Sequence, residues 1–279
     1  MRFLIFGYGY LAHKFLEHIG KDKAVITKAD IANISQVKAA VDKYEPTTIL
    51  NCAGRTGHPN IDWCEEHKME TLYSNVAGPL ILAKVADTYD LKMVHLGSGC
   101  VYQGGTEVAY KESDKPDPNK IPSYYSKTKA WAEEMLAYFP ILQLRLRMPL
   151  DGVPSPRNLI WKITHYEKVI DVPNSITVIP DFINAAIELI NREKVGIYNV
   201  INPGFIKHSE ILDLYKKIVD PDFKYKTFSV EELEEITKAG RSNCILDTAK
   251  LKGEGIELPE IHDRLPQVLK EYKENLNSK

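Results

Sequence analysis

The sequence predicts an α/β protein in which a Rossmann-like, doubly wound parallel sheet is joined to a smaller C-terminal substrate-binding region. Three observations predict this fold. Short apolar segments alternate with helical segments through the first 150 residues, the apolar segments are hydrophobic at successive positions, and a glycine-rich turn joins the first strand to the first helix. Continuous apolar strands are typical of a parallel sheet covered by helices on both faces.

Each element follows from its own pattern. A short apolar run before a turn predicts a strand, and apolar positions spaced three and four apart predict a helix. We expect strands at residues 3–6, 24–27, 47–51, 92–97 and 141–146. We expect helices at residues 10–19, 35–44 with Ser35 as the cap, 63–89 for the most part, and 125–138.

The alternation weakens beyond Pro149, where Pro and Gly become frequent. We therefore predict a dinucleotide-binding domain over residues 1–150. A helix at 182–191 and a strand at 196–200 should return to its sheet, so that 181–200 belongs to it. We expect a substrate-binding cap over the carboxyl ends of the strands, built from residues 151–180 and 201–279 with helices near 209–219, 230–239 and 265–276.

Composition excludes several classes of function. The 36 Lys plus Arg residues nearly balance 38 Asp plus Glu residues, so we expect neither nucleic acid nor a membrane surface as partner. The four cysteines form no CxxC pair and no metal-like spacing with His, so we expect no disulfide scaffold and no metal. Without a signal peptide or an apolar span in the sequence, we expect a cytoplasmic protein.

A glycine-rich motif, GxGxxA, lies between the first strand and the first helix. Gly7 permits the tight turn, Gly9 lets the backbone approach a pyrophosphate, and Ala12 lets the helix pack closely. The alternative is an ordinary strand-to-helix turn. The position of the motif, between a strand and a helix, favours dinucleotide binding, and we expect contacts from Gly7, Tyr8, Gly9, Tyr10 and Leu11.

The end of the second strand favours NADPH over NADH. Lys28 suits the 2′-phosphate of NADPH, while Asp30 and Ile31 are expected against the adenine. The alternative for Lys28 is a solvated surface lysine.

Tyr125 and Lys129 are four residues apart at the start of an expected helix, so both side chains project from one face. A lysine beside a phenol favours the phenolate and tunes it for proton transfer to a carbonyl oxygen. YxxxK is common by chance, but here it follows the fourth strand, where Ser98 would supply a second donor. Cys100, two residues beyond Ser98 in an extended segment, should point into the same cavity. The alternative for Cys100 is a small buried filler.

Together with the segment Asn51-Cys52-Ala53-Gly54 and with Asn75, these residues resemble the short-chain dehydrogenase/reductase superfamily in its extended, nucleotide-sugar-modifying branch. The resemblance implies a Rossmann fold, NADPH as cofactor, and cofactor contacts from Asn51, Ala53, Gly54, Asn75, Tyr125 and Lys129. It also implies a homodimer through the long helices, whose apolar faces are otherwise explained as core.

Longer motifs are more specific. They include the segments at residues 56–65, 98–100, 124–129, 147–149, 156–164 and 241–243, and they resemble bifunctional 3,5-epimerase/4-reductases of UDP-L-rhamnose synthesis. The chain departs from that pattern in a glycine turn one residue shorter and in His58 where Arg is usual. The second departure puts a substrate role for His58 in doubt.

This resemblance implies that UDP-4-keto-6-deoxy-D-glucose is epimerised at C3 and C5 and reduced at C4. It assigns Ser98, Tyr125 and Lys129 to the reduction and Cys100 with Lys162 to proton transfer. It implies substrate contacts from Thr56, His58, Asn60, Arg157, Asn158, Arg241 and Asn243, with Arg241 pairing with the pyrophosphate.

Two rival functions remain open at this stage. One is a reductase only, as in dTDP-4-dehydrorhamnose reductase, and the other is a non-catalytic NADPH-binding regulatory subunit. Tyr125 and Lys129 argue against the second. The sequence does not choose between UDP and dTDP. We interpret Cys52, Cys64 and Cys244 as structural, and His95 as a core histidine.

Overall fold

The computed structural model describes residues 1–58, 60–104 and 108–278. Its central feature is a six-stranded sheet with the strand order β2-β1-β3-β4-β5-β9, in which all neighbours are parallel. The strands are β1 (Phe3–Phe6), β2 (Ala24–Thr27), β3 (Thr48–Asn51), β4 (Lys92–Ser98), β5 (Leu142–Leu146) and β9 (Gly196–Asn199). The predicted strands are confirmed, with ends shifted by a residue in places, and residues 196–199 do return to this sheet.

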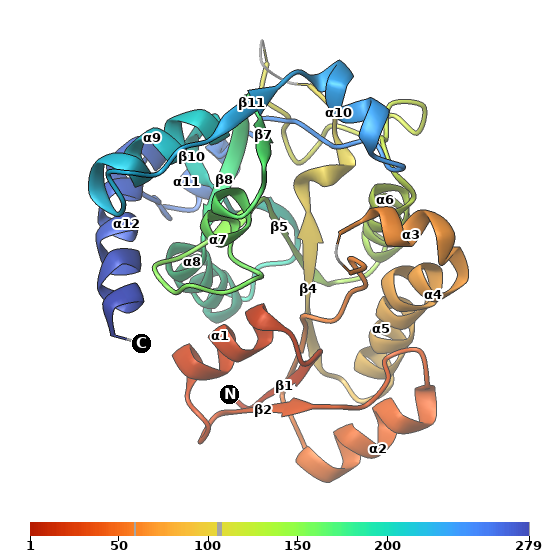
Figure 1. The fold of residues 1–279 in the computed structure, drawn as a ribbon. Helices are drawn as coiled ribbons and strands as arrows, with labels where there is room; N and C mark the ends of the chain where they lie inside the picture. Colours follow the sequence, from red (N-terminus) through yellow and green to blue (C-terminus); the bar gives the residue numbers. More distant parts are fainter. Residues whose placement is uncertain (59, 105–107, 279) are drawn as a thin grey trace.

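Helices cover both faces of the sheet (Figure 1). Helices α1 (Tyr10–Ile19) and α8 (Ile179–Asn191) share one core with β1 and β5, where Phe15 meets Phe182 edge to face. Helices α2 (Ile34–Tyr44), α5 (Gly78–Thr88) and α6 (Tyr124–Leu136) pack on the other face. This arrangement confirms the doubly wound sheet.

Two local predictions are corrected. The cap of α2 is Asn33, whose Oδ1 accepts from the amides of Ser35 and Gln36. Residues 63–89 do not form one helix, because the chain breaks at His67 between two five-residue helices and then widens into a π-helical turn. These elements are α3 (Asp62–Glu66), α4 (Lys68–Leu72) and η1 (Tyr73–Ala77), followed directly by α5.

The C-terminal part has its own core, in which Ile160, Ile206 and Leu265 are fully buried. Its strands form a three-stranded sheet, β10-β8-β6, and a two-stranded sheet, β11-β7. Figure 1 shows most of these elements on the side toward which β4 runs. They are β6 (Pro149–Leu150), α7 (Leu159–Thr164), β7 (Lys168–Ile170), β8 (Asn174–Val178), β10 (Asn202–Ile206), α9 (His208–Ile218), β11 (Lys226–Phe228), α10 (Val230–Ile236) and α12 (Ile261–Asn277).

One C-terminal element lies elsewhere. Helix α11 (Ala249–Gly253) packs beside β9, and its Leu251 is buried in the core of the large sheet. Within the described residues no helix is both long and apolar enough to cross a membrane. The same residues contain no group of three His, Cys, Asp or Glu side chains placed to hold a metal ion.

Candidate active site

The glycine turn combines a left-handed glycine, open space and an uncapped helix start. Gly7 has φ +99°, and a Cβ there would lie 2.6 Å from the amide nitrogen of Ala53, so no other residue fits. At Gly9, by contrast, a Cβ would meet no described atom within 4 Å. Among the described residues no side chain caps α1, and its first turn carries no acidic residue. The first amides of α1 therefore remain available to an anion.

The next predicted cofactor residues, Lys28, Asp30 and Ile31, lie just after the end of β2. The ring of Tyr8 is 60% exposed, and the ammonium of Lys28 lies 4.9 Å from its centre, so the end of β2 lies beside the glycine turn. Asp30 is exposed, and its Oδ1 accepts from the amide of Ala32 at 2.9 Å. The prediction for Ile31 is corrected, because its side chain is 4% exposed and packs in the core against Gly78.

The side chains of Tyr10 and Leu11 point away from the glycine turn. Leu11 packs against the core of the large sheet, and the hydroxyl of Tyr10 donates to Asp151 at 2.6 Å. Any contact that these two residues make with a pyrophosphate is therefore through the backbone.

Two buried asparagines shape the segment after β3. Asn51 bonds the ring of His95 at 2.9 Å and accepts from the amide of Ala53 at 3.0 Å. Asn75 accepts from the amide of Arg55 at 2.7 Å and donates to Thr128 Oγ1 at 3.1 Å. Both side-chain amides hold the loop that contains Ala53 and Gly54. The cofactor contacts of Asn51 and Asn75 stay a prediction.

His95 is a core histidine, as predicted. It is 1% exposed in β4, and burial, reinforced by the nearby charge of Lys129, holds its pKa well below the ordinary value.

The predicted catalytic residues meet at the carboxyl end of β4. Ser98 ends β4, and Tyr125 and Lys129 project from the first turns of α6, which Ser123 caps through the amide of Ser126 at 3.1 Å. Lys129 is 6% exposed and donates from Nζ to the carbonyl of Leu96 at 2.9 Å. This bond anchors the catalytic helix directly to the strand that carries Ser98.

Burial dominates the protonation of Tyr125. It raises the pKa of the phenol, as does the neighbouring Cys100, while a hydrogen bond with Ser98 lowers that pKa. Burial likewise lowers the pKa of Lys129, and the charges of Cys100 and Glu133 oppose that effect. On balance these effects favour the protonated form of the Tyr125 phenol in the free protein, and Lys129 stays a predicted catalytic residue.

Cys100 lies in this cluster, but not for the predicted reason. Residues Gly99–Val101 form a 3₁₀ turn, η2, and the amide of Cys100 donates back to Ser98 Oγ at 3.2 Å. Alternation along an extended strand therefore does not apply. Cys100 is half-buried in the turn that directly follows β4, and it influences the pKa values of both Tyr125 and Lys129 electrostatically.

Cys64 and Cys244 are buried and Cys52 is partly buried against the core, which agrees with structural roles for these three cysteines.

The residues predicted to bind substrate fall into two groups. Lys162 is half-buried on α7, and burial followed by the charge of Arg157 lowers the pKa of its ammonium group. Arg157 donates to Thr56 Oγ1 at 3.3 Å, which joins this segment to the loop after β3. His58 and Asn60 are exposed on that loop. These five residues have surfaces that a ligand can reach.

The second group is occupied by protein contacts. Asn158 is fully buried and caps α7, and Asn243 is 6% exposed and bonds Asn174 at 3.0 Å. In the free protein both side chains make hydrogen bonds within the protein, and their substrate contacts stay a prediction. Arg241 pairs with Asp62 at 2.8 Å, and the same carboxylate accepts from the amide of Ala239 at 2.9 Å. Asp62 therefore holds the C-terminal segment and does not cap α3.

Three buried charged residues lie close to these elements, and of them the sequence analysis named only Arg147, within the motif at 147–149. Arg145 lies in β5, Arg147 directly follows that strand, and Asp151 directly follows β6. Arg147 donates from Nε to Asn174 at 3.1 Å and also bonds the carbonyl of Ser242. The signal for the two arginines was present, because charged residues interrupt an otherwise apolar strand segment.

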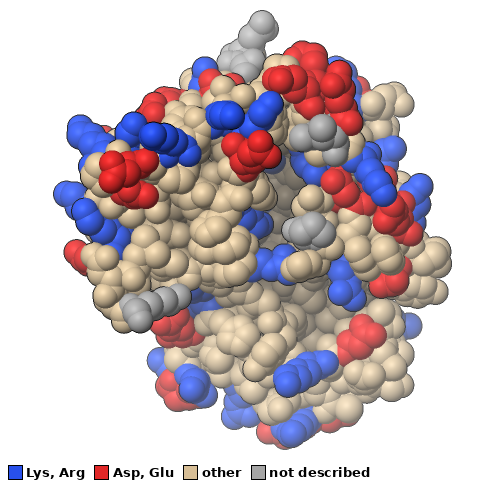
Figure 2. Space-filling model, viewed as in Figure 1, with Lys and Arg blue, Asp and Glu red and all other residues tan. Residues whose placement is uncertain are grey.

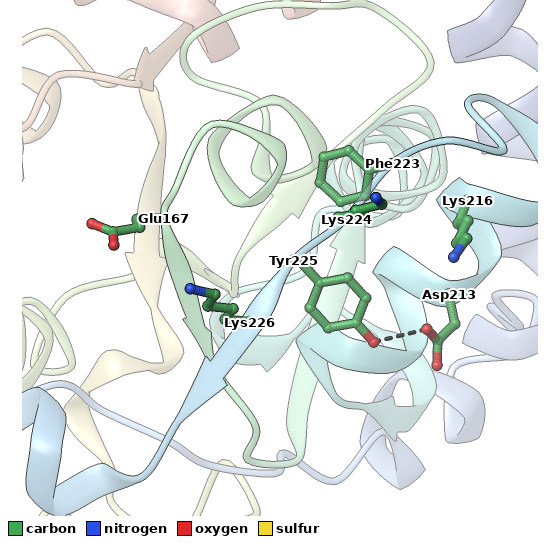
Figure 3. Close-up of a pocket in the computed structure, with 7 residues that line it drawn as sticks. All are labelled: Glu167, Asp213, Lys216, Phe223, Lys224, Tyr225 and Lys226. Carbon is green, nitrogen blue, oxygen red and sulfur yellow. Dashed lines mark hydrogen bonds between the residues drawn. The ribbon is translucent and has the colours of Figure 1, made fainter.

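Basic side chains gather around the hollow in the middle of the face shown in Figure 2. A separate cavity of about 490 Å³ lies between α9 and the segment leading into β11. There Tyr225 donates to Asp213 at 2.7 Å, and Phe223, Lys224 and Lys226 complete part of the lining (Figure 3). None of the predicted site residues lines this cavity.

The glycine turn after β1 and the Ser98, Tyr125 and Lys129 cluster at the end of β4 define an oxidoreductase of the short-chain dehydrogenase/reductase type. A family model described as RmlD substrate binding domain matches residues 1–140. The chain belongs to this family.

Known relatives agree. A bifunctional dTDP-4-dehydrorhamnose 3,5-epimerase/dTDP-4-dehydrorhamnose reductase of Arabidopsis thaliana is 42% identical over 237 residues, which cover 82% of this chain and 78% of that protein. A trifunctional UDP-glucose 4,6-dehydratase/UDP-4-keto-6-deoxy-D-glucose 3,5-epimerase/UDP-4-keto-L-rhamnose-reductase of the same plant is 41% identical, but the match spans 95% of this chain and only 41% of that relative. The crystal structure of a UDP-rhamnose synthase from Acanthamoeba polyphaga mimivirus has a TM-score of 0.91 at 30% identity, covering 97% of this chain and 99% of that one.

Proposed function

We propose that this chain converts UDP-4-keto-6-deoxy-D-glucose into UDP-β-L-rhamnose, by epimerisation at C3 and C5 and NADPH-dependent reduction at C4. The observation that supports the proposal is that the start of α6, with Tyr125 and Lys129, packs on the end of β4 and on the turn η2, where the amide of Cys100 bonds Ser98 Oγ at 3.2 Å. A carbonyl held there faces hydroxyl donors and a thiol together. The relatives that share both activities by name support the same assignment.

The residues of the glycine turn fit a dinucleotide. The open space at Gly9 and the free amides of α1 would receive its pyrophosphate, and Lys28 beside Tyr8 would receive a 2′-phosphate. When bound, NADPH supplies the hydride that C4 accepts.

Reduction needs a proton at O4 as the hydride arrives at C4. Tyr125 is the donor, because burial keeps its phenol protonated, and Ser98 bonds the same oxygen. Proton transfer leaves Tyr125 as a phenolate. The ammonium group of Lys129, held by its hydrogen bond to the Leu96 carbonyl, stabilises this negative charge.

Epimerisation uses the same hold on O4. Removal of the proton at C3 or C5 leaves an enolate whose charge lies on O4, where Ser98 and Tyr125 stabilise it. Inversion then needs a base on one face and an acid on the other, and these roles fall to Cys100 and Lys162. The lowered pKa of Lys162 suits donation of a proton from its ammonium group. Cys100 removes a proton as the thiolate and returns one as the thiol, so its sulfur must stay reduced, as it does in the cytoplasm.

The decisive experiment uses the purified chain with UDP-4-keto-6-deoxyglucose in deuterium oxide, with and without NADPH. We expect deuterium at C3 and C5 without NADPH, and UDP-rhamnose with it. Cys100→Ser and Lys162→Met should each stop the exchange, whereas Lys84→Met, an exposed lysine on α5, serves as the matched control. A C4-reduced product with no deuterium at either carbon would replace the proposal with a reductase only.

We also propose a homodimer. Large apolar side chains are exposed on α4, η1, α6 and the segment after α6, and α6 packs against α4 and η1. They are Met69, Tyr73, Trp131, Met135, Tyr138 and Phe139. An exposed apolar surface of this kind is typical of a contact between subunits.

A further inference from the structure

Asp151 is a buried carboxylate that joins two distant parts of the chain. It is 2% exposed, and its Oδ1 accepts from Tyr10 at 2.6 Å, from the amide of Val153 at 2.9 Å and from Asn158 Nδ2 at 2.9 Å. The ammonium of Lys14 lies 2.9 Å from its other oxygen. A carboxylate with so many partners is fixed in place.

One side of this network is the helix that follows the glycine turn. Tyr10 and Lys14 are the first and fifth residues of α1, four positions apart on one face. Tyr10 donates a hydrogen bond to Asp151, and Lys14 forms an ion pair with it. Burial and the hydrogen bond to Asp151 raise the pKa of the Tyr10 phenol, so this hydroxyl remains a donor. The carboxylate thereby fixes the turn of α1 whose amides face the pyrophosphate.

The other side is the helix that carries Lys162. The amide of Asn158 donates to the Asp151 carbonyl at 2.7 Å and to the Val153 carbonyl at 2.9 Å, while its Oδ1 accepts from the amide of Ile160 at 2.9 Å. The amide of Lys162 in turn donates to the carbonyl of Asn158 at 3.1 Å. The start of α7, and with it the direction of Lys162, therefore depends on the same network.

We propose that Asp151 is a positioning residue that couples occupancy of the glycine turn to the placement of Lys162. A pyrophosphate on the amides of α1 restrains Tyr10 and Lys14, these restrain Asp151, and Asp151 restrains Asn158 and the start of α7. Cofactor occupancy then accelerates proton exchange at the sugar carbons, although the exchange consumes no hydride. This inference rests on the proposed epimerase function.

The test measures deuterium uptake at C3 and C5 from deuterium oxide, at saturating UDP-4-keto-6-deoxyglucose, with and without saturating NADP⁺. The oxidised cofactor fills the site but cannot reduce the ketone. For the wild-type chain we expect stimulation of about fivefold or more, the lower end of common coupling strengths. Tyr10→Phe and Asp151→Asn should bring the ratio of the two rates close to one.

The ratio separates coupling from simple structural damage, because a variant that is only less well folded lowers both rates together. Tyr89→Phe is the matched control, since Tyr89 bonds Asp42 at 2.9 Å on the far side of the large sheet, and it should keep the wild-type ratio. Equal wild-type rates with and without NADP⁺, or a full ratio in both Tyr10→Phe and Asp151→Asn, would overturn the coupling while leaving the epimerase intact. Absence of any exchange in the wild type would overturn the proposed epimerase function itself, and the coupling with it.

Discussion

Arg145 and Glu133 form a two-point ion pair at the base of the active site. Nε and Nη2 of Arg145 each donate to a different oxygen of Glu133, both at 2.7 Å, and the two residues are 1% and 5% exposed. Glu133 lies one helical turn beyond Lys129 on α6, and its charge raises the pKa of Lys129 against the effect of burial. The pair therefore joins β5 to the helix that carries Tyr125.

Arg145→Met should be strongly destabilising. It leaves the Glu133 carboxylate buried without its partner, which costs about 3–5 kcal/mol of unfolding free energy. Urea denaturation measures the change. Lys92→Met removes an exposed pair with Glu193 and should cost less than about 1 kcal/mol, so similar losses in both variants would contradict the prediction.

Tyr125→Phe should separate the two proposed activities. Loss of the phenolic proton should lower the rate of C4 reduction by about 10²–10⁴, measured as NADPH oxidation. Deuterium exchange should fall less, because Ser98 still bonds O4 in the enolate. Tyr124→Phe, one residue earlier on α6, is the control. An equal loss of both activities in Tyr125→Phe would argue against the assigned role.

Lys28→Ala should weaken selection for NADPH. A hydrogen bond to a charged group contributes about 1.5–3 kcal/mol, so the KM for NADPH should rise roughly 10- to 100-fold while that for NADH changes little. Steady-state kinetics with both cofactors measure this. Lys38→Ala, an exposed lysine on α2, is the matched control. An unchanged preference in Lys28→Ala would exclude Lys28 from the 2′-phosphate site.

His208 should make the protein sensitive to acid. Burial, reinforced by Arg147 and opposed by Asp171, lowers its pKa from 6.5 to about 4. As the pH falls, His208 is therefore protonated in the unfolded chain before it is protonated in the folded one. The free energy of unfolding falls between pH 6.5 and 4, by about 3 kcal/mol in total at about 1.4 kcal/mol per pKa unit. In His208→Gln, the free energy of unfolding from denaturation curves should no longer show this loss between pH 6.5 and 4. A wild-type pH profile in the variant would refute the assignment.

Met135→Glu should disrupt the proposed dimer. Met135 is 44% exposed, so the charge should leave the stability of each subunit nearly unchanged while placing a carboxylate in an apolar contact. Sedimentation should give twice the mass of the chain for the wild type and the single mass for the variant. Val108→Glu, at a residue 74% exposed outside this surface, should leave the assembly as it is. A wild-type monomer would rule out the dimer.

The elements of the large sheet could be predicted because their strands are buried on both faces and read as continuous apolar runs. β6 and β7 could not be predicted, since two or three residues are too few to show a period. The break at His67 lies within a sequence with helical spacing on both sides, and nothing local marks the π-helical turn after it.

The candidate site could be predicted where a reactive residue type lies at a recognisable place in the fold. Ser98 at the end of a strand and Tyr125 with Lys129 at the start of a helix are such cases. The sequence could not show which amides are already satisfied inside the protein. Asn158 and Asn243 have the residue type of ligand contacts, but their partners lie elsewhere along the chain. Tyr10 bonds a residue 141 positions away, and such a partner has no signature in a single sequence.

The position of β9 at the edge of the large sheet has a consequence for synthesis. The strand that pairs with β5, and the helix α8 that brings Phe182 against Phe15, come after β6, α7, β7 and β8 of the C-terminal part. As the chain leaves the ribosome, the first 150 residues expose the edge of β5 and one side of α1 until residue 199 has emerged. An unpaired strand edge invites association with other chains. The large sheet, which carries the glycine turn, is therefore completed only by a segment that the ribosome makes some 50 residues after β5.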